Sequence, residues 1–105
     1  MPLSKPFILT IGCKVWPEKQ KDYLKIMQQI SSRSKRSKYL SSFQLWNNLE
    51  DPQVYIERYE YKSRQHYNRF KKDKKELAKF LPLMEELKRI IDQKDIQQNL
   101  WHKIF

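Results

Sequence analysis

The chain has 105 residues, a length that suits a single thin hydrophobic core, so residues 1–105 are expected to form one domain. Its 22 lysines and arginines exceed its 12 acidic residues, giving a net charge of +10. The single glycine excludes the glycine-rich loops that hold phosphates and dinucleotides, and the single cysteine excludes an intramolecular disulfide and a cysteine-based zinc site. No apolar run reaches the length of a membrane span, and the lone cysteine fits a reducing compartment, so we expect a cytoplasmic protein.

The first third of the chain predicts a strand followed by a helix. Residues 7–16 carry an apolar side chain at every odd position, which is typical of a strand with one face in a core. Pro17 ends this strand and suits the first turn of a helix predicted over residues 18–32. One face of that helix is marked by Tyr23, Ile26, Met27 and Ile30. Residues 31–38 have no apolar side chain and are predicted to form an exposed basic loop.

The middle of the chain predicts a hairpin and a short helix. Residues 39–47 and 54–61 alternate in the manner of strands and flank turn-forming residues, so we expect them to pair antiparallel. Ser63 suits the N-cap position of a helix that continues through Phe70, because its hydroxyl can accept a hydrogen bond from a free backbone N–H.

The last third predicts a broken helix and a final strand. An apolar stripe over residues 76–91 is interrupted by Pro82, so the helix there either kinks or begins anew. The stripe consists of Leu77, Phe80, Leu81, Met84, Leu87 and Ile91. Residues 96–105 are predicted to form a fourth strand. The order β-α-β-β-α-β predicts an α+β, ferredoxin-like split βαβ fold, in which helices cover one face of a four-stranded antiparallel sheet.

Alternation divides the predicted strands into two faces with different roles. The candidate ligand-binding residues face the helices or close the space from the helical side: Ile11, Cys13, Phe43, Tyr59, Tyr67 and Phe70. They either line an apolar pocket, the usual form of a small-molecule site, or simply fill the core. The opposite face carries Trp46 and Ile56 among charges that can pair, which predicts a homodimer through the sheet faces.

Glu57 and His66 are the candidate catalytic residues. Glu57 falls on the apolar face, where burial raises the pKa of a carboxyl. It either accepts a proton from a substrate or forms a structural pair with a lysine, an arginine or a tyrosine hydroxyl. His66 is either an acid–base group or an exposed helix residue, and Cys13 is either a small buried hydrophobe or a nucleophile. Two histidines and one cysteine make no recognisable metal signature, so no metal site is expected.

Three stretches carry a resemblance to a known family. Residues 40–52 form a strand and an Asp-Pro turn, residues 54–63 contain a Glu-x-Tyr strand, and residues 77–84 form a late helix. In this order and spacing they resemble the antibiotic biosynthesis monooxygenase family, over about residues 7–92. The resemblance implies a dimeric α+β barrel with a pocket between sheet and helices.

The same resemblance bears on the chemistry. Family members that cleave haem carry an Asn, a Trp and a His at positions that match Ile11, Tyr59 and Phe70, so haem cleavage is not expected here. Other members oxidise electron-rich polycyclic aromatics without any cofactor, which implies a cofactor-independent monooxygenase with an apolar or aromatic ligand. Two alternatives stay open. One is a non-catalytic dimer that binds or senses a ligand; the other is a polyanion-binding protein that uses residues 33–38 and 71–75. Binding to nucleic acid is expected to be weak at most, and no membrane partner is expected.

Overall fold

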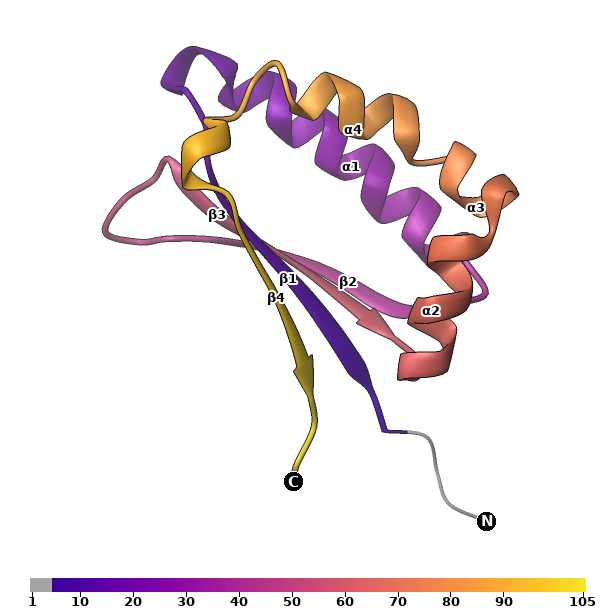
Figure 1. The fold of residues 1–105 in the computed structure, drawn as a ribbon. Helices are drawn as coiled ribbons and strands as arrows, with labels where there is room; N and C mark the ends of the chain where they lie inside the picture. Colours follow the sequence, from indigo (N-terminus) through magenta and orange to yellow (C-terminus); the bar gives the residue numbers. More distant parts are fainter. Residues whose placement is uncertain (1–4) are drawn as a thin grey trace.

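The computed structural model describes residues 5–105, and its centre is one sheet of four strands (Figure 1). The strands are β1 (Phe7–Lys14), β2 (Leu40–Asn47), β3 (Val54–Tyr61) and β4 (Gln97–His102). Their order across the sheet is β2-β3-β1-β4, so the first and third strands are central. All three pairings are antiparallel, which confirms the predicted α+β, ferredoxin-like split βαβ arrangement.

The α-helices lie on one face of this sheet and leave the other face uncovered (Figure 1). After β1, the 3-10 turn η1 (Pro17–Lys19) leads into α1 (Gln20–Arg36). After β3 come α2 (Arg64–Lys72), α3 (Lys74–Ala78) and α4 (Leu81–Leu87), and the 3-10 turn η2 (Gln93–Asp95) leads into β4. Helix α4 runs beside α1 in this layer. None of the helices in the described residues has the length and apolar character needed to cross a bilayer.

Helix α1 extends further than predicted, because residues 31–36 are helical instead of an exposed loop. Ser34 is buried and lies four residues after a core isoleucine, so the face that packs on the sheet continues through it. The basic side chains of Arg33, Lys35 and Arg36 lie in the last turn, where the helix dipole favours positive charge. The predicted basic loop is therefore wrong up to Arg36.

The second helical region is interrupted at residues 79–80 and begins anew at Leu81, and this break changes which side chains are buried. Pro82 lies in the first turn of α4, where its missing N–H has no intrahelical partner to lose. The buried side chains here are Phe80, Leu83, Leu87 and Ile90. Leu81 and Met84, which the predicted stripe included, are 50% and 45% exposed. Residues 79–80 do not continue an α-helix, so the buried positions shift in phase from an uninterrupted 3.6-residue period.

Aromatic rings fill the space between α2 and the sheet. The ring centroid of Tyr67 lies 5.1 Å from that of Phe7 and 5.0 Å from that of Tyr61. The ring of Phe70 lies 5.7 Å from Tyr61 and 5.5 Å from Phe80. Tilted and edge-on ring pairs contribute roughly 1 kcal/mol each beyond their buried area. This aromatic cluster therefore holds α2 over the ends of β1 and β3.

Candidate functional site

The middle of the helix-facing side of the sheet brings most of the predicted site residues together. Ile11 of β1 pairs with Glu57 of β3, and Leu45 of β2 pairs with Glu57 from the other side. Tyr59 and Phe43 pair in the next row, and their ring centroids are 5.0 Å apart. Directly paired residues of neighbouring strands point to the same face. All five side chains therefore face the helices, as the alternation predicted.

Glu57 is the centre of a buried group that we call the Glu57 cluster, consisting of Cys13, Tyr23, Glu57 and Tyr59. The Tyr59 hydroxyl donates to Glu57 Oε1 at 2.7 Å, and the Tyr23 hydroxyl of α1 donates to Glu57 Oε2 at 3.0 Å. Cys13 Sγ lies 3.5 Å from the Tyr23 hydroxyl oxygen and 3.9 Å from Glu57 Oε2. Only 3% of Glu57 is exposed. Of the predicted partners for this carboxyl, the structure shows tyrosine hydroxyls, one on each oxygen.

No cation compensates this carboxyl, since none of the ion pairs within residues 5–105 involves Glu57. Burial raises the pKa of Glu57, and the hydrogen bonds from Tyr59, Tyr23 and Cys13 offset that rise only in part. Burial also raises the pKa of the Cys13 thiol to about 11, so the thiol keeps its proton at neutral pH and is a poor nucleophile. The pKa values of Tyr23 and Tyr59 are raised by burial and then by the nearby Glu57 charge. The thiol and both tyrosines therefore keep their protons at neutral pH, and Glu57 is the most acidic member of the cluster.

Tyr59, which bonds to this buried carboxyl, is itself only partly buried. Ile11 and Tyr59 keep part of their surface exposed, although the flanking residues on the same side of their strands are buried. On the edge strand β4, Gln98 pairs with Ile11 and is exposed, so the helices do not cover the sheet there. Ile11, which pairs with Glu57, therefore lies next to the uncovered edge of the sheet.

The other predicted site residues lie apart from the Glu57 cluster. His66 is in the first turn of α2, where its Nδ1 lies 2.6 Å from the hydroxyl of Ser63, the N-cap residue. Tyr67 and Phe70 are buried in the aromatic cluster beneath α2. Tyr23, in contrast, belongs to the cluster but is not among the predicted site residues. The sequence feature that could identify Tyr23 as a site residue is its hydroxyl on the core face of a helix, in a protein that also places a carboxyl on the core face of a strand.

No metal-binding group is present in the part of the chain that the structure describes. Within residues 5–105, no three His, Cys, Asp or Glu side chains come close enough together to hold a metal ion. The polar atoms that converge in the Glu57 cluster are a carboxyl, two tyrosine hydroxyls and a protonated thiol. This set suits the transfer of a proton better than the coordination of a cation.

The uncovered face of the sheet carries large apolar side chains from three strands, and we call Trp46, Ile56 and Trp101 the apolar patch. Their exposed fractions are 59%, 46% and 54%. The indole N–H of Trp101 donates to the Thr10 hydroxyl at 2.8 Å, which holds the ring over this face. The position of Trp101 does not follow from the sequence, because the orientation of β4 depends on its register with β1, in which Ile8 pairs with Trp101.

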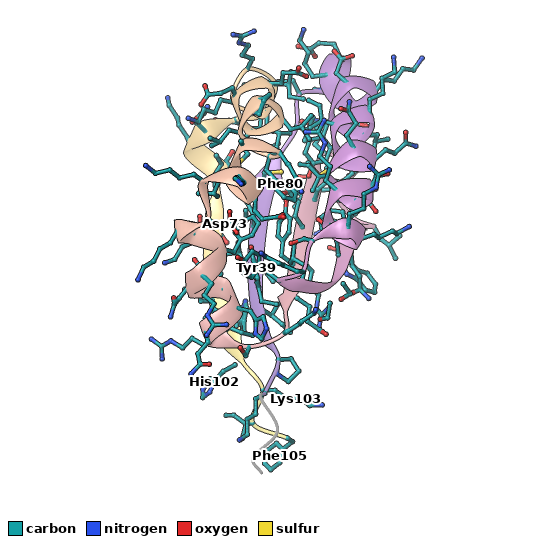
Figure 2. All side chains as sticks on the ribbon, turned by 90° about the vertical axis from the view of Figure 1, so that its right-hand side faces the viewer. Tyr39, Asp73, Phe80, His102, Lys103 and Phe105 are labelled. Carbon is teal, nitrogen blue, oxygen red and sulfur yellow. The ribbon has the colours of Figure 1, made fainter. Side chains whose placement is uncertain are left out.

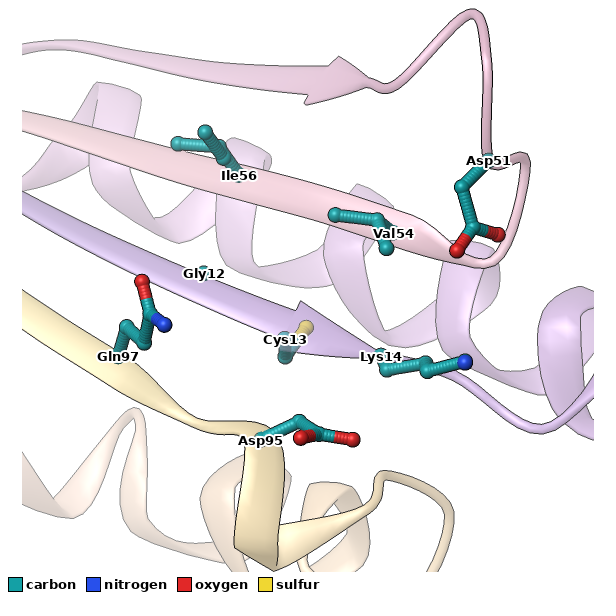
Figure 3. A pocket seen from close by; sticks show the side chains of 8 residues that line it. All are labelled: Gly12, Cys13, Lys14, Asp51, Val54, Ile56, Asp95 and Gln97. Atoms are coloured by element: carbon teal, nitrogen blue, oxygen red, sulfur yellow. The ribbon is translucent and has the colours of Figure 1, made fainter.

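A hollow of about 330 Å³ opens beside the apolar patch (Figure 3). Gly12 leaves space in its floor, and the side chains of Lys14, Asp51 and Asp95 contribute charge to its lining. A Cβ atom at Gly12 would meet atoms of Gln97 at 3.8 and 3.9 Å, which is ordinary van der Waals contact. The uncovered face is therefore not flat and can receive a protruding side chain.

Solved structures share this fold, although no protein-family model and no curated protein matches the sequence. A putative antibiotic biosynthesis monooxygenase from Nitrosomonas europaea has a TM-score of 0.82 and 12% identity, over 100% of this chain and 96% of that one. SnoaB, a cofactor-independent oxygenase from Streptomyces nogalater, has a TM-score of 0.79 and 10% identity, over 97% and 96%. A conserved protein from Methanosarcina mazei has a TM-score of 0.80 and 14% identity, over 94% and 93%. The chain therefore has the fold of the antibiotic biosynthesis monooxygenases.

Proposed function

We propose, from the fold shared with the antibiotic biosynthesis monooxygenases, that this chain is a homodimeric, cofactor-independent monooxygenase for a polycyclic aromatic substrate. The observation that carries the proposal is the Glu57 cluster, a buried carboxyl without a cation that accepts a hydrogen bond from the partly exposed Tyr59. Burying a carboxyl costs free energy, so an apolar residue at this position would serve a purely structural core better. A chemical role for Glu57 accounts for that cost.

The proposed reaction needs a proton acceptor and oxygen, while the substrate supplies the electrons. An anthrone-type ring that loses a proton becomes an anion that can reduce O₂. The ring CH₂ then becomes a carbonyl, and the second oxygen atom leaves as water. Tyr59 would take up the substrate proton while passing its own to Glu57 Oε1, 2.7 Å away. Because burial raises the pKa of Glu57, its carboxylate is a stronger base than that of an ordinary surface glutamate.

The other predicted site residues take supporting positions in this proposal. Ile11, Phe43 and Tyr59 form the ligand wall, because they lie together on the helix-facing side and are only partly buried. Tyr67 and Phe70 support α2 from within the aromatic cluster. We assign no chemical step to His66, because its Nδ1 is engaged with the N-cap serine.

The proposed dimer forms through the uncovered sheet face. Association would remove the apolar patch from water, and central apolar side chains among polar neighbours are typical of subunit interfaces. Arg58 and Glu60 pair at 3.1 Å on this face, so they can enter an interface without leaving an unpaired charge. The hollow at Gly12 would receive a side chain of the second copy.

A non-catalytic ligand-binding dimer is the second candidate. The observation in its favour is that both oxygens of Glu57 already accept hydrogen bonds from tyrosines, so the cluster is satisfied without a substrate. In that case the same wall would bind an aromatic ligand, and Glu57 would only hold Tyr59 and Tyr23 in place.

Turnover of an anthrone under oxygen separates the two candidates. The wild-type protein should convert it to the quinone, and Glu57→Gln should lower kcat by about 10²-fold or more, since general base catalysis contributes about 10²–10⁴-fold. Binding of the anthrone, followed by isothermal titration calorimetry, should persist in the variant. Binding without turnover in the wild type would favour the non-catalytic dimer, and turnover that is indifferent to Glu57→Gln would refute the proton-accepting role.

A further inference from the structure

Two basic segments that are far apart in the sequence meet at one end of the molecule. Arg33 Nη1 donates to the main-chain carbonyl of Lys79, and the Tyr39 hydroxyl donates to Asp73 Oδ2 at 2.6 Å. Lys38 Nζ lies 3.9 Å from the same Asp73 oxygen. Figure 2 shows Tyr39 and Asp73 in this region, where the end of α1 faces α2 and α3. These contacts join the two segments into one surface.

We call this surface the basic end and define it by residues 33–38 and 69–79. These residues include ten lysines and arginines and two acidic residues, a net charge of +8 compared with +10 for the whole chain. All of the basic side chains are exposed except that of Arg33, which is half-buried. The charge excess of the protein is therefore concentrated at one end and is not spread over its surface.

Local structure accounts for only part of this concentration. Among the ion pairs within residues 5–105, only Lys38 and Lys79 of the ten basic residues have a carboxylate partner. The last turns of α1 and α2 favour positive charge through the helix dipole, but Lys74 begins α3, where the dipole disfavours it. Like charges at close range repel each other, so the clustering opposes stability unless a polyanion compensates it.

The chemistry of the basic end selects among polyanions. The aromatic side chains within and next to it, Phe70, Tyr39 and Phe80, are buried, so they cannot stack on unpaired bases or insert into a bilayer. Most of its charges are lysines, whose flexible ammonium groups neutralise phosphates but do not read base edges. A duplex presents one phosphate per about 1.7 Å of its axis, a density that suits such a cluster. We propose that the basic end binds the phosphate backbone of a nucleic-acid duplex without sequence preference.

The test compares two variants that each lose four lysine charges. In the first, Lys71, Lys72, Lys74 and Lys75 of the basic end are changed to glutamine. In the matched control, Lys21, Lys25, Lys88 and Lys94 are changed to glutamine; these are also exposed but lie elsewhere. Binding of each full-length protein to a fluorescent DNA duplex is followed by anisotropy between about 50 and 200 mM salt, where about six phosphate contacts would cost the wild type about 10³-fold in affinity. Circular dichroism confirms that both variants are folded.

The basic-end variant should bind the duplex at least tenfold more weakly at about 50 mM salt. Its slope of log affinity against log salt concentration should be about 3–4 less negative than that of the wild type, whereas the control should lose much less affinity. Competition by an unrelated duplex sequence should be equal. Equal losses in the two variants would overturn the proposal, because net charge alone would then explain the binding. Absence of duplex binding, or tighter binding to phosphatidylserine vesicles than to the duplex, would overturn it as well.

Discussion

Replacing Glu57 by glutamine changes how the stability of the protein depends on pH. Burial raises the pKa of Glu57 in the folded protein, so between its unfolded and folded pKa values the folded state holds the proton and the unfolded state does not. Stability is therefore fully retained below the unfolded pKa and falls as pH rises through this window. Glutamine has nearly the same shape as the protonated carboxyl and does not titrate, so the variant lacks this loss.

The size of the effect follows from one proton. Starting from the unfolded pKa of about 4.3, the wild type loses about 1.4 kcal/mol of unfolding free energy per pH unit relative to the variant, until the folded pKa is reached. At low pH the two proteins should differ by only about 1 kcal/mol, the worth of one altered hydrogen bond to Tyr23 or Tyr59. The variant should therefore gain about 1.4 kcal/mol on the wild type for each pH unit by which the folded pKa exceeds the unfolded one.

Urea unfolding followed by tryptophan fluorescence measures this difference at half-unit steps from about pH 4 to pH 8, at one fixed protein concentration because a dimer's stability depends on it. Glu60→Gln serves as the control, since Glu60 lies on the opposite sheet face and pairs with Arg58. Parallel stability curves for the wild type and Glu57→Gln would refute the raised pKa. A variant less stable by about 3–5 kcal/mol at neutral pH would mean that Glu57 is held as a compensated charge.

Further outcomes are expected at other sites. The wild type should sediment at about twice the monomer mass of 13.0 kDa, and a wild-type monomer would contradict the dimer. Trp46→Asp should shift the protein to monomer without loss of helix, because Trp46 is exposed within one copy. Ser63→Ala should lower the free energy of unfolding in urea by about 1 kcal/mol, because it removes the hydrogen bond from the His66 N–H to the Ser63 hydroxyl. The control Ser32→Ala, on the exposed surface of α1, should change it by no more than about 0.5 kcal/mol. Equal losses in the two variants would argue against the cap. Haemin incubated with the protein and a reductant should keep its Soret absorbance. Conversion of the haem to a tetrapyrrole product, abolished by His66→Ala, would show that the protein cleaves haem.

The sheet was predictable because a strand repeats every two residues. Residues 54–61 are rich in β-branched and aromatic side chains, which predicts a strand with the observed bounds. The period of two then places Glu57 and Tyr59 towards the helices and Ile56 towards the other face. A single carboxyl on an apolar face was enough to single out Glu57, because burial of an acid is costly wherever it occurs.

Contacts between distant segments were not predictable in this way. Tyr23 and Glu57 are 34 residues apart, and only the packing of α1 over the sheet brings the hydroxyl to the carboxyl. Trp101 depends on the register between β4 and β1, which no local pattern specifies. The end of α1 was missed because Ser34 fills a core position that a purely apolar period does not recognise.

The region from α2 to α4 consists of short helices where one long helix could have formed, and this division sets which parts of the molecule open first. Helix α3 has five residues, too few to be stable alone, so it depends on the Asp73 cap and on its neighbours. Segments of this kind unfold locally at lower free energy than a central sheet. Amides of α3 should therefore exchange with solvent before those of β1 and β3. Local opening of α3 would leave both hydrogen bonds of Glu57 in place, because they come from Tyr23 of α1 and Tyr59 of β3.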